Sequence, residues 1–167
     1  VVATGSAVVS LDGVRVSIPA GVMNADAAVT CQSGASLSII RTVVESSPSN
    51  LIPGISAQST CSELTVASSV SRSNGGSGVL LGNGRKYAIS NSLFSDNTTG
   101  VDFSSNAQGT FRFNTVVNNA AGVNCPSIQG GQSLESSLIV QNGGGTGVAA
   151  QGLTNCTFLT TSLGSMN

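Results

Sequence analysis

Residues 91–103 read NSLFSDNTTGVDF, and this stretch decides the fold because the chain repeats it. A close copy, NTVVNNAAGVNC, follows at residues 114–125. Two further copies are SVSRSNGGSGVLL at 69–81 and SLIVQNGGGTGVAA at 137–150. Every copy has a small polar residue before apolar ones, then a turn with asparagine, then a Gly-Val pair. Self-similarity at a fixed period is the signature of a repeat architecture.

The copies recur about every 23 residues. Four apolar anchors are each 23 residues apart, namely Val70, Leu93, Val116 and Ile139. The turn asparagines are 23, 22 and 23 residues apart, namely Asn74, Asn97, Asn119 and Asn142. The pattern continues more loosely toward the ends, in RTVV at 41–44 and NCTFL at 155–159. The spacing predicts that equivalent residues form columns across stacked units.

Short runs of near-alternating apolar residues, separated by Asn, Gly and Ser, are typical of strands and turns. A unit of this size cannot bury its own apolar face. Stacked copies can, with equivalent strands paired about 4.8 Å apart. We expect the glycine of each Gly-Val pair to occupy a corner with positive φ. The turn asparagines suit the same corners, and their amides are expected to pair along the stack.

With these motifs the chain resembles the right-handed parallel β-helix family, the pectin-lyase-like superfamily. The resemblance is close over residues 64–159, looser over 37–63, and compositional over 1–36. It implies an all-β fold, a right-handed parallel β-helix (β-solenoid) of about six to seven coils with about 23 residues each. A β-sandwich of short strands is the alternative, which the fixed period disfavours.

We expect a single domain over residues 1–167. Within it, the sequence predicts a less regular N-terminal coil region at 1–36, recognisable repeats at 37–159, and a C-terminal end at 160–167. The first residue is Val1 and no charged-then-apolar leader follows it. This start predicts a processed product or a piece of a longer protein.

The composition excludes several classes of protein. Only 8% of the 167 residues are charged, and six Lys and Arg residues provide no basic surface for nucleic acid. Apolar residues make up 40% of the chain, which is too many for a disordered segment. No apolar run approaches the roughly 18 residues that a membrane span needs.

Four cysteines stand at positions Cys31, Cys61, Cys125 and Cys156. Zinc is not expected, because the chain has no CxxC pair and no histidine. We prefer two disulfides in an oxidising compartment, with four buried free thiols as the alternative. Cys31 and Cys61 each precede an expected strand and are predicted to meet in neighbouring coils. The other predicted pair, Cys125–Cys156, requires the last coils to shift register.

The resemblance also says what an enzyme of this superfamily would need. Its lyases hold Ca²⁺ with several carboxylates and use an Arg or Lys base, and its hydrolases cluster Asp residues on one face. The nearest acids in sequence here, Asp96 and Asp102, are expected to leave the coil on different faces. We therefore predict no enzyme activity, no metal and no cofactor.

Three residues are candidates for binding a polysaccharide. Arg112 and Glu135 are 23 residues apart, so neighbouring coils place them side by side on an outer face. They form either part of a sugar-binding strip or a surface ion pair worth about 0–1 kcal/mol. Tyr87, next to Arg85 and Lys86, is a candidate for stacking on a sugar ring.

Two functions follow from these features. The first is an extracellular structural or cell-surface β-solenoid, a non-catalytic bacterial secreted or surface member of the superfamily. Its partners would be further copies, stacked head to tail into a filament through open strand edges, or the rest of a longer surface protein. The second is a carbohydrate-binding or polysaccharide-lyase-like module that acts on acidic polysaccharide.

Overall fold

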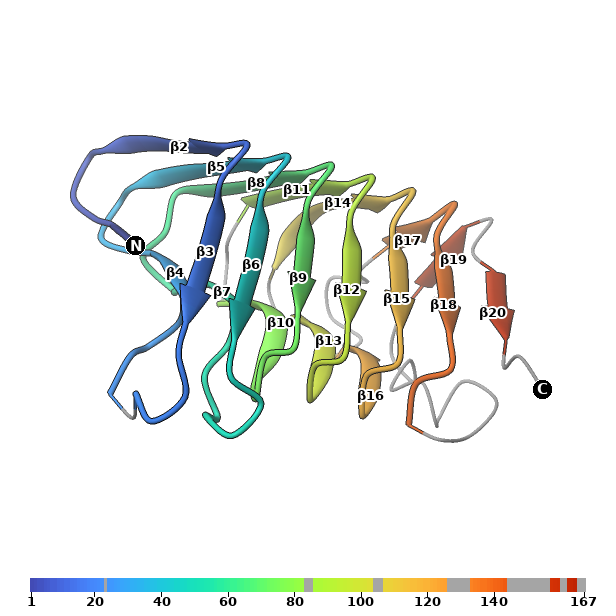
Figure 1. Ribbon diagram of the computed structural model, residues 1–167. Coiled ribbons are helices and arrows are strands. Elements are labelled where there is room, and N and C mark those ends of the chain that lie inside the picture. Colours follow the sequence, from blue (N-terminus) through green and yellow to red (C-terminus); the bar gives the residue numbers. More distant parts are fainter. Residues whose placement is uncertain are drawn as a thin grey trace.

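The computed structural model describes residues 1–22, 24–82, 86–103, 107–125, 133–143, 157–159 and 162–164, and it forms a parallel β-solenoid (Figure 1). Sheet A contains β1 (Val2–Ala3), β4 (Val29–Cys31), β7 (Ile55–Ala57), β10 (Ser77–Leu81), β13 (Thr99–Phe103) and β16 (Ala121–Asn124), paired in that order. Every pairing along the stack is parallel.

Sheets B and C are built in the same way. Sheet B contains β2 (Val8–Asp12), β5 (Ser36–Ile40), β8 (Glu63–Ala67), β11 (Lys86–Ser90), β14 (Gln108–Arg112), β17 (Ser133–Glu135) and β19 (Thr157–Leu159). Sheet C contains β3 (Arg15–Ile18), β6 (Val43–Ser46), β9 (Val70–Arg72), β12 (Leu93–Ser95), β15 (Thr115–Val117), β18 (Leu138–Val140) and β20 (Ser162–Gly164). One strand from each sheet, taken in the order A, B, C, makes one coil.

The core lies between the three sheets, and it consists of columns of equivalent side chains. In sheet A, register pairs Cys31 with Ala57, Ala57 with Leu81 and Leu81 with Phe103. All four are fully buried, as strand alternation requires for residues on one face. Leu81, Phe103 and Cys125 each stand two residues after the valine of a Gly-Val pair, and all three are buried.

Polar columns line two corners of the solenoid. The predicted asparagine pairing is confirmed, because the side chains of Asn74, Asn97 and Asn119 each donate to the Oδ1 of the next member, ending at Asn142. At the corner between sheets B and C, the backbone N–H groups of Thr42, Ser69, Ser92 and Asn114 donate to the side-chain oxygen one coil on. Both columns satisfy backbone groups that the turns leave without a strand partner.

One predicted column is wrong by a single residue. Val70 does pair with Leu93, but Leu93 then pairs with Thr115 rather than Val116. The coil from Leu93 to Thr115 is 22 residues long instead of 23. The hydrogen bond from Asn97 to Asn119 joins residues with the same separation of 22. Leu93 therefore points outward, while its neighbour Phe94 occupies the core column with Val116.

The expected role of the Gly-Val glycines is also wrong. Gly78 and Gly100 are not among the residues with positive φ. A Cβ on Gly100 would lie 2.5 Å from the Gly122 carbonyl oxygen and 2.5 Å from Val116 Cγ1. Close approach of neighbouring coils, not backbone conformation, requires glycine there. Positive φ falls instead on the residue before each ladder asparagine, namely Ser73, Asp96, Asn118 and Gln141.

Cys31 and Cys61 form a disulfide with Cα atoms 5.2 Å apart, the pair that the sequence analysis preferred. The bond ties neighbouring coils together at the corner that joins sheets A and B. The other predicted pair, Cys125–Cys156, includes Cys156, which lies outside the described residues.

Candidate functional site

A ridge of side chains runs along the corner between sheets B and C. We call it the B–C ridge, and its members are Arg41, Ser68, Asn91, Phe113 and Ser136, all with positive φ. Arg112 and Glu135 precede the last two members and are register partners in β14 and β17, so the structure brings these two predicted residues together. Arg112 is exposed and Glu135 is partly exposed.

Tyr87, the third predicted residue, is not part of this surface. It occupies the same inward column as Leu37 and Leu64, and only 4% of the residue is exposed. Its ring packs against Phe103 with centroids 5.3 Å apart. Burial raises the pKa of the Tyr87 hydroxyl above its usual value. We therefore correct the prediction, because strand alternation turns Tyr87 into the core, where it cannot stack on a sugar.

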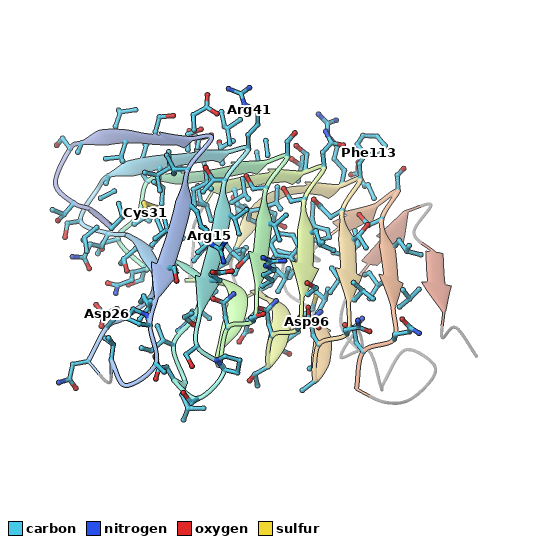
Figure 2. All side chains as sticks on the ribbon, in the orientation of Figure 1. Arg15, Asp26, Cys31, Arg41, Asp96 and Phe113 are labelled. Atoms are coloured by element: carbon cyan, nitrogen blue, oxygen red, sulfur yellow. A yellow bond between two sulfur atoms is a disulfide. The ribbon has the colours of Figure 1, made fainter. Side chains whose placement is uncertain are left out.

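Phe113 is an exposed aromatic residue that was not among the residues predicted from the sequence. It stands out from the B–C ridge (Figure 2) and is 56% exposed. The Arg112 guanidinium carbon lies 5.9 Å from the centre of its ring. The sequence holds a signal for it, because an aromatic residue occupies the position that other repeats fill with Ser68, Asn91 and Ser136.

A second candidate surface lies on the outer face of sheet A. A groove of about 510 Å³ is lined by residues that include Asp26, Ser56, Gln58 and Leu80. Gln58 Nε2 donates a hydrogen bond of 3.3 Å to Asp26 Oδ2, which ties the loop before β4 to the groove. Asp102 pairs with Leu80 in register and continues this outward row.

Asp102 is the carboxylate of this face with an altered acidity. Burial raises its pKa above the usual value, and a hydrogen bond of 2.9 Å from Asn124 Nδ2 partly opposes that effect. Asp96, the nearest acid in sequence, lies in the exposed turn after β12 instead. Asp96 and Asp102 thus lie on different parts of the coil, as expected.

Sheet C carries an ion-pair network on its outer face. Glu45 accepts hydrogen bonds from Arg15, at 2.9 Å to Nε, and from Arg72 at 3.4 Å. The hydrogen bond from Arg15 is the main cause that holds the pKa of Glu45 below its usual range. Because both arginines are largely exposed, the network joins three neighbouring coils at a gain of about 0–1 kcal/mol per pair.

The first coil leaves one edge of the stack without a strand partner. Within the described residues, β1, β2 and β3 each stand at the end of their sheet. Their inward residues Val9, Leu11, Val16 and Ile18 are only partly buried. Their partners one coil on, Leu37, Ile39 and Val44, are 0–2% exposed. Among the described residues, the core is therefore less covered at this coil, next to a cavity of about 380 Å³.

The described residues hold neither a helix that could span a membrane nor a group of metal ligands. Among the described residues, no helix is long and apolar enough to cross a membrane. In the same part of the chain, no three His, Cys, Asp or Glu side chains are grouped so that they could hold a metal ion.

Comparison with known proteins gives one result. The family model described as "right handed beta helix region" matches residues 4–163. No curated protein and no solved structure matches the chain. The family match covers nearly the whole sequence and agrees with the three parallel sheets, so the chain belongs to the right-handed β-helix family.

Proposed function

We propose that this protein is an extracellular or cell-surface structural solenoid that stacks end to end through its first coil. The observation that carries the proposal is the open edge formed by β1, β2 and β3. Unpaired strand edges are templates for further strands, and the partly exposed Val9 and Leu11 would be buried by another coil. The Cys31–Cys61 disulfide supports an oxidising location outside the cytosol.

The edge strands β2 and β3 keep only part of the protection that usually blocks such pairing. Val8 is 85% exposed on the edge strand β2. The charged side chains of this coil turn toward the next coil, because Asp12 pairs with Arg41 and Arg15 pairs with Glu45. Free charged side chains on an edge strand are one of the main protections of natural edges. Because the charges of Asp12 and Arg15 are paired with residues of the next coil, they leave the edge available to another copy of the chain.

A proline on the free edge tests the proposal. The Ala7 carbonyl accepts from Ser36 and the Gly13 N–H donates to Ile40, so by strand alternation the Ser10 N–H faces the open edge. Ser10→Pro should keep the fold, since proline is tolerated where the N–H points away from the sheet. It should abolish end-to-end association. Ser10→Ala is the matched control.

Sedimentation velocity across a concentration series, followed by negative-stain electron microscopy, measures the outcome. The proposal expects rods that lengthen with concentration for the wild type and for Ser10→Ala, and single short rods for Ser10→Pro. Wild-type protein that stays monomeric at every concentration overturns it.

The sheet A groove favours a second candidate, the binding of a polysaccharide. The groove presents Asp26 and Gln58, and Asp102 continues the outward row beside it; these polar groups suit the hydroxyl groups of a sugar. The two carboxylates would repel a uronate chain, so this groove favours a neutral polysaccharide over the acidic one expected from the family resemblance. Titration with a soluble β-glucan and with polygalacturonate separates the two. Binding of polygalacturonate with release of unsaturated product would instead favour a lyase.

A further inference from the structure

Phe113 has the least expected backbone conformation on the B–C ridge. Its φ is 58°. Bulky side chains rarely adopt this left-handed region, which costs about 1–2 kcal/mol for residues other than glycine and is tolerated best by asparagine and aspartate. The equivalent positions of the neighbouring coils hold Asn91 and Ser136. A phenylalanine is therefore a costly choice at a corner where a small polar residue suffices.

Packing in the core does not offset this cost. Phe94, Phe103 and Phe111 are fully buried, whereas Phe113 is 56% exposed. Backbone strain that persists without a packing reason points toward a function for the residue. The apolar surface of the exposed ring is removed from water only when a ligand binds over it.

Polar groups lie near the Phe113 ring, and backbone hydrogen bonds hold the corner that carries it in place. The Phe113 N–H donates to the Glu135 carbonyl oxygen at 3.1 Å, which holds the corner against the next coil. The Asn91 N–H points to the Arg112 carbonyl oxygen at 3.4 Å on the other side. The Arg112 guanidinium lies over the ring, and Glu135 is the register partner of Arg112 in the next coil. The exposed ring is thus accompanied by a planar donor group, and a residue with a carboxylate stands one coil on.

We propose that Phe113, Arg112 and Glu135 form a binding site for a pyranose ring of a glycan. A pyranose combines an apolar C–H face with a rim of hydroxyl groups, which matches a single exposed ring accompanied by donors and acceptors. A protein partner would favour an aromatic anchor within a larger apolar patch. A nucleic acid would need a basic field, and the chain carries seven acidic against six basic residues.

This site is separate from the sheet A groove and does not depend on end-to-end stacking. The glycan would lie along the B–C ridge, where successive coils present polar side chains about 4.8 Å apart. The ridge members on either side of Phe113 are Asn91 and Ser136. They would contact sugars next to the one that stacks on the ring.

The substitution Phe113→Asn provides a test in which stability and binding change in opposite directions. Asparagine is favoured at positive φ, so Phe113→Asn should unfold at an equal or higher temperature than the wild type. It should also lose the stacking contact and bind glycan roughly 2- to 12-fold more weakly. Phe113→Tyr should retain binding, and Arg112→Ala should weaken it. Leu138→Asn, which replaces another exposed apolar residue, is the matched control.

Affinity electrophoresis through gels that contain β-glucan, xyloglucan, galactomannan, alginate or polygalacturonate measures the retardation of each variant. The expected result is retardation of the wild type, Phe113→Tyr and Leu138→Asn by at least one of these glycans, with reduced retardation of Phe113→Asn. Absence of wild-type retardation by every glycan overturns the proposal. The proposal is also overturned if Phe113→Asn leaves the retardation unchanged while Asp102→Asn abolishes it, since the sugar then binds on the outer face of sheet A.

Discussion

Asn97 donates twice to the side chain of Asn119 in the next coil. Its Nδ2 lies 2.9 Å from Asn119 Oδ1, and its backbone N–H lies 3.0 Å from the same oxygen. Asn119 repeats both bonds to Asn142, at 2.8 and 3.0 Å. Each asparagine thus joins two coils, and the three side chains are 0–4% exposed. At the start of the ladder, Asn74 Oδ1 is buried without a hydrogen-bond partner among the described residues.

Replacing the central asparagine should be costly. Asn119→Ala leaves the buried Asn97 backbone N–H without its acceptor. It also removes one hydrogen bond each from Asn97 Nδ2, Asn142 Oδ1 and the Phe94 carbonyl oxygen. A buried N–H without a partner costs about 1–3 kcal/mol and each further lost hydrogen bond about 0.5–1.5 kcal/mol, so we expect a loss of about 3 kcal/mol or more in the free energy of unfolding. Urea denaturation measures it. Asn118→Gly is the control, because Asn118 is exposed with positive φ and should tolerate glycine. Equal losses for both variants would contradict the role of the ladder.

Two glycines should respond differently to alanine. Gly100→Ala places a Cβ against a backbone oxygen of the next coil that cannot move aside, so we expect a loss of about 3 kcal/mol or more. Gly13 has a φ of 66°, and no atom lies within 4 Å of the position that a Cβ would take there. Gly13→Ala should cost only about 1–2 kcal/mol, from backbone strain alone. Thermal unfolding of both variants checks the order, and a larger loss at Gly13 would contradict it.

The Cys31–Cys61 disulfide closes a loop with a sequence separation of 30. The chain-entropy model gives about 3–4 kcal/mol for a loop of this length, which the double variant Cys31→Ala with Cys61→Ala should lose. Calorimetry without reductant measures the difference. Ser62→Ala is the control at the same corner, because it removes one hydrogen bond between coils and no covalent bond. A double variant as stable as this control would show that packing alone holds the corner.

Tyr87 is the only tyrosine and the chain has no tryptophan, so one absorbance band reports its ionisation. Burial raises the folded-state pKa above the unfolded value of about 10. The resulting stability is fully present below pH 10 and is lost as the pH rises above it. We expect the tyrosinate band to appear only together with the loss of the β-sheet circular dichroism signal. Tyr87→Phe should unfold at higher pH, and titration of the folded wild type near pH 10 would contradict the buried position.

Strand positions and much of the core could be predicted because they depend on local order along the chain. Alternation placed Leu81 and Phe103 on the inner face, and the recurring asparagines indicated a ladder. Phe94 could not be placed in the same way, because one coil is a residue shorter than the coils on either side. Leu93 therefore pairs with Thr115, and Phe94 rather than Leu93 faces the core beside Val116.

The candidate site was only partly predictable. The repeat length placed Arg112 beside Glu135, since register between neighbouring coils follows from it. The ring beside them is Phe113 rather than Tyr87, and this depends on the turn geometry at the corner. Residues 85–87 resemble an exposed junction in sequence, yet Tyr87 lies in the strand column of Leu64 and packs on Phe103.

The class of fold, the approximate length of each coil and the residues that stack at its corners could all be inferred from the sequence alone. These properties follow from periodicity, because a repeat can bury its apolar face only against its own copies. The tertiary structure was needed to show why position 100 must be glycine and that Phe113, rather than Tyr87, is exposed. Both features depend on which atoms of the next coil lie opposite each residue. The order of residues within one repeat does not specify those contacts.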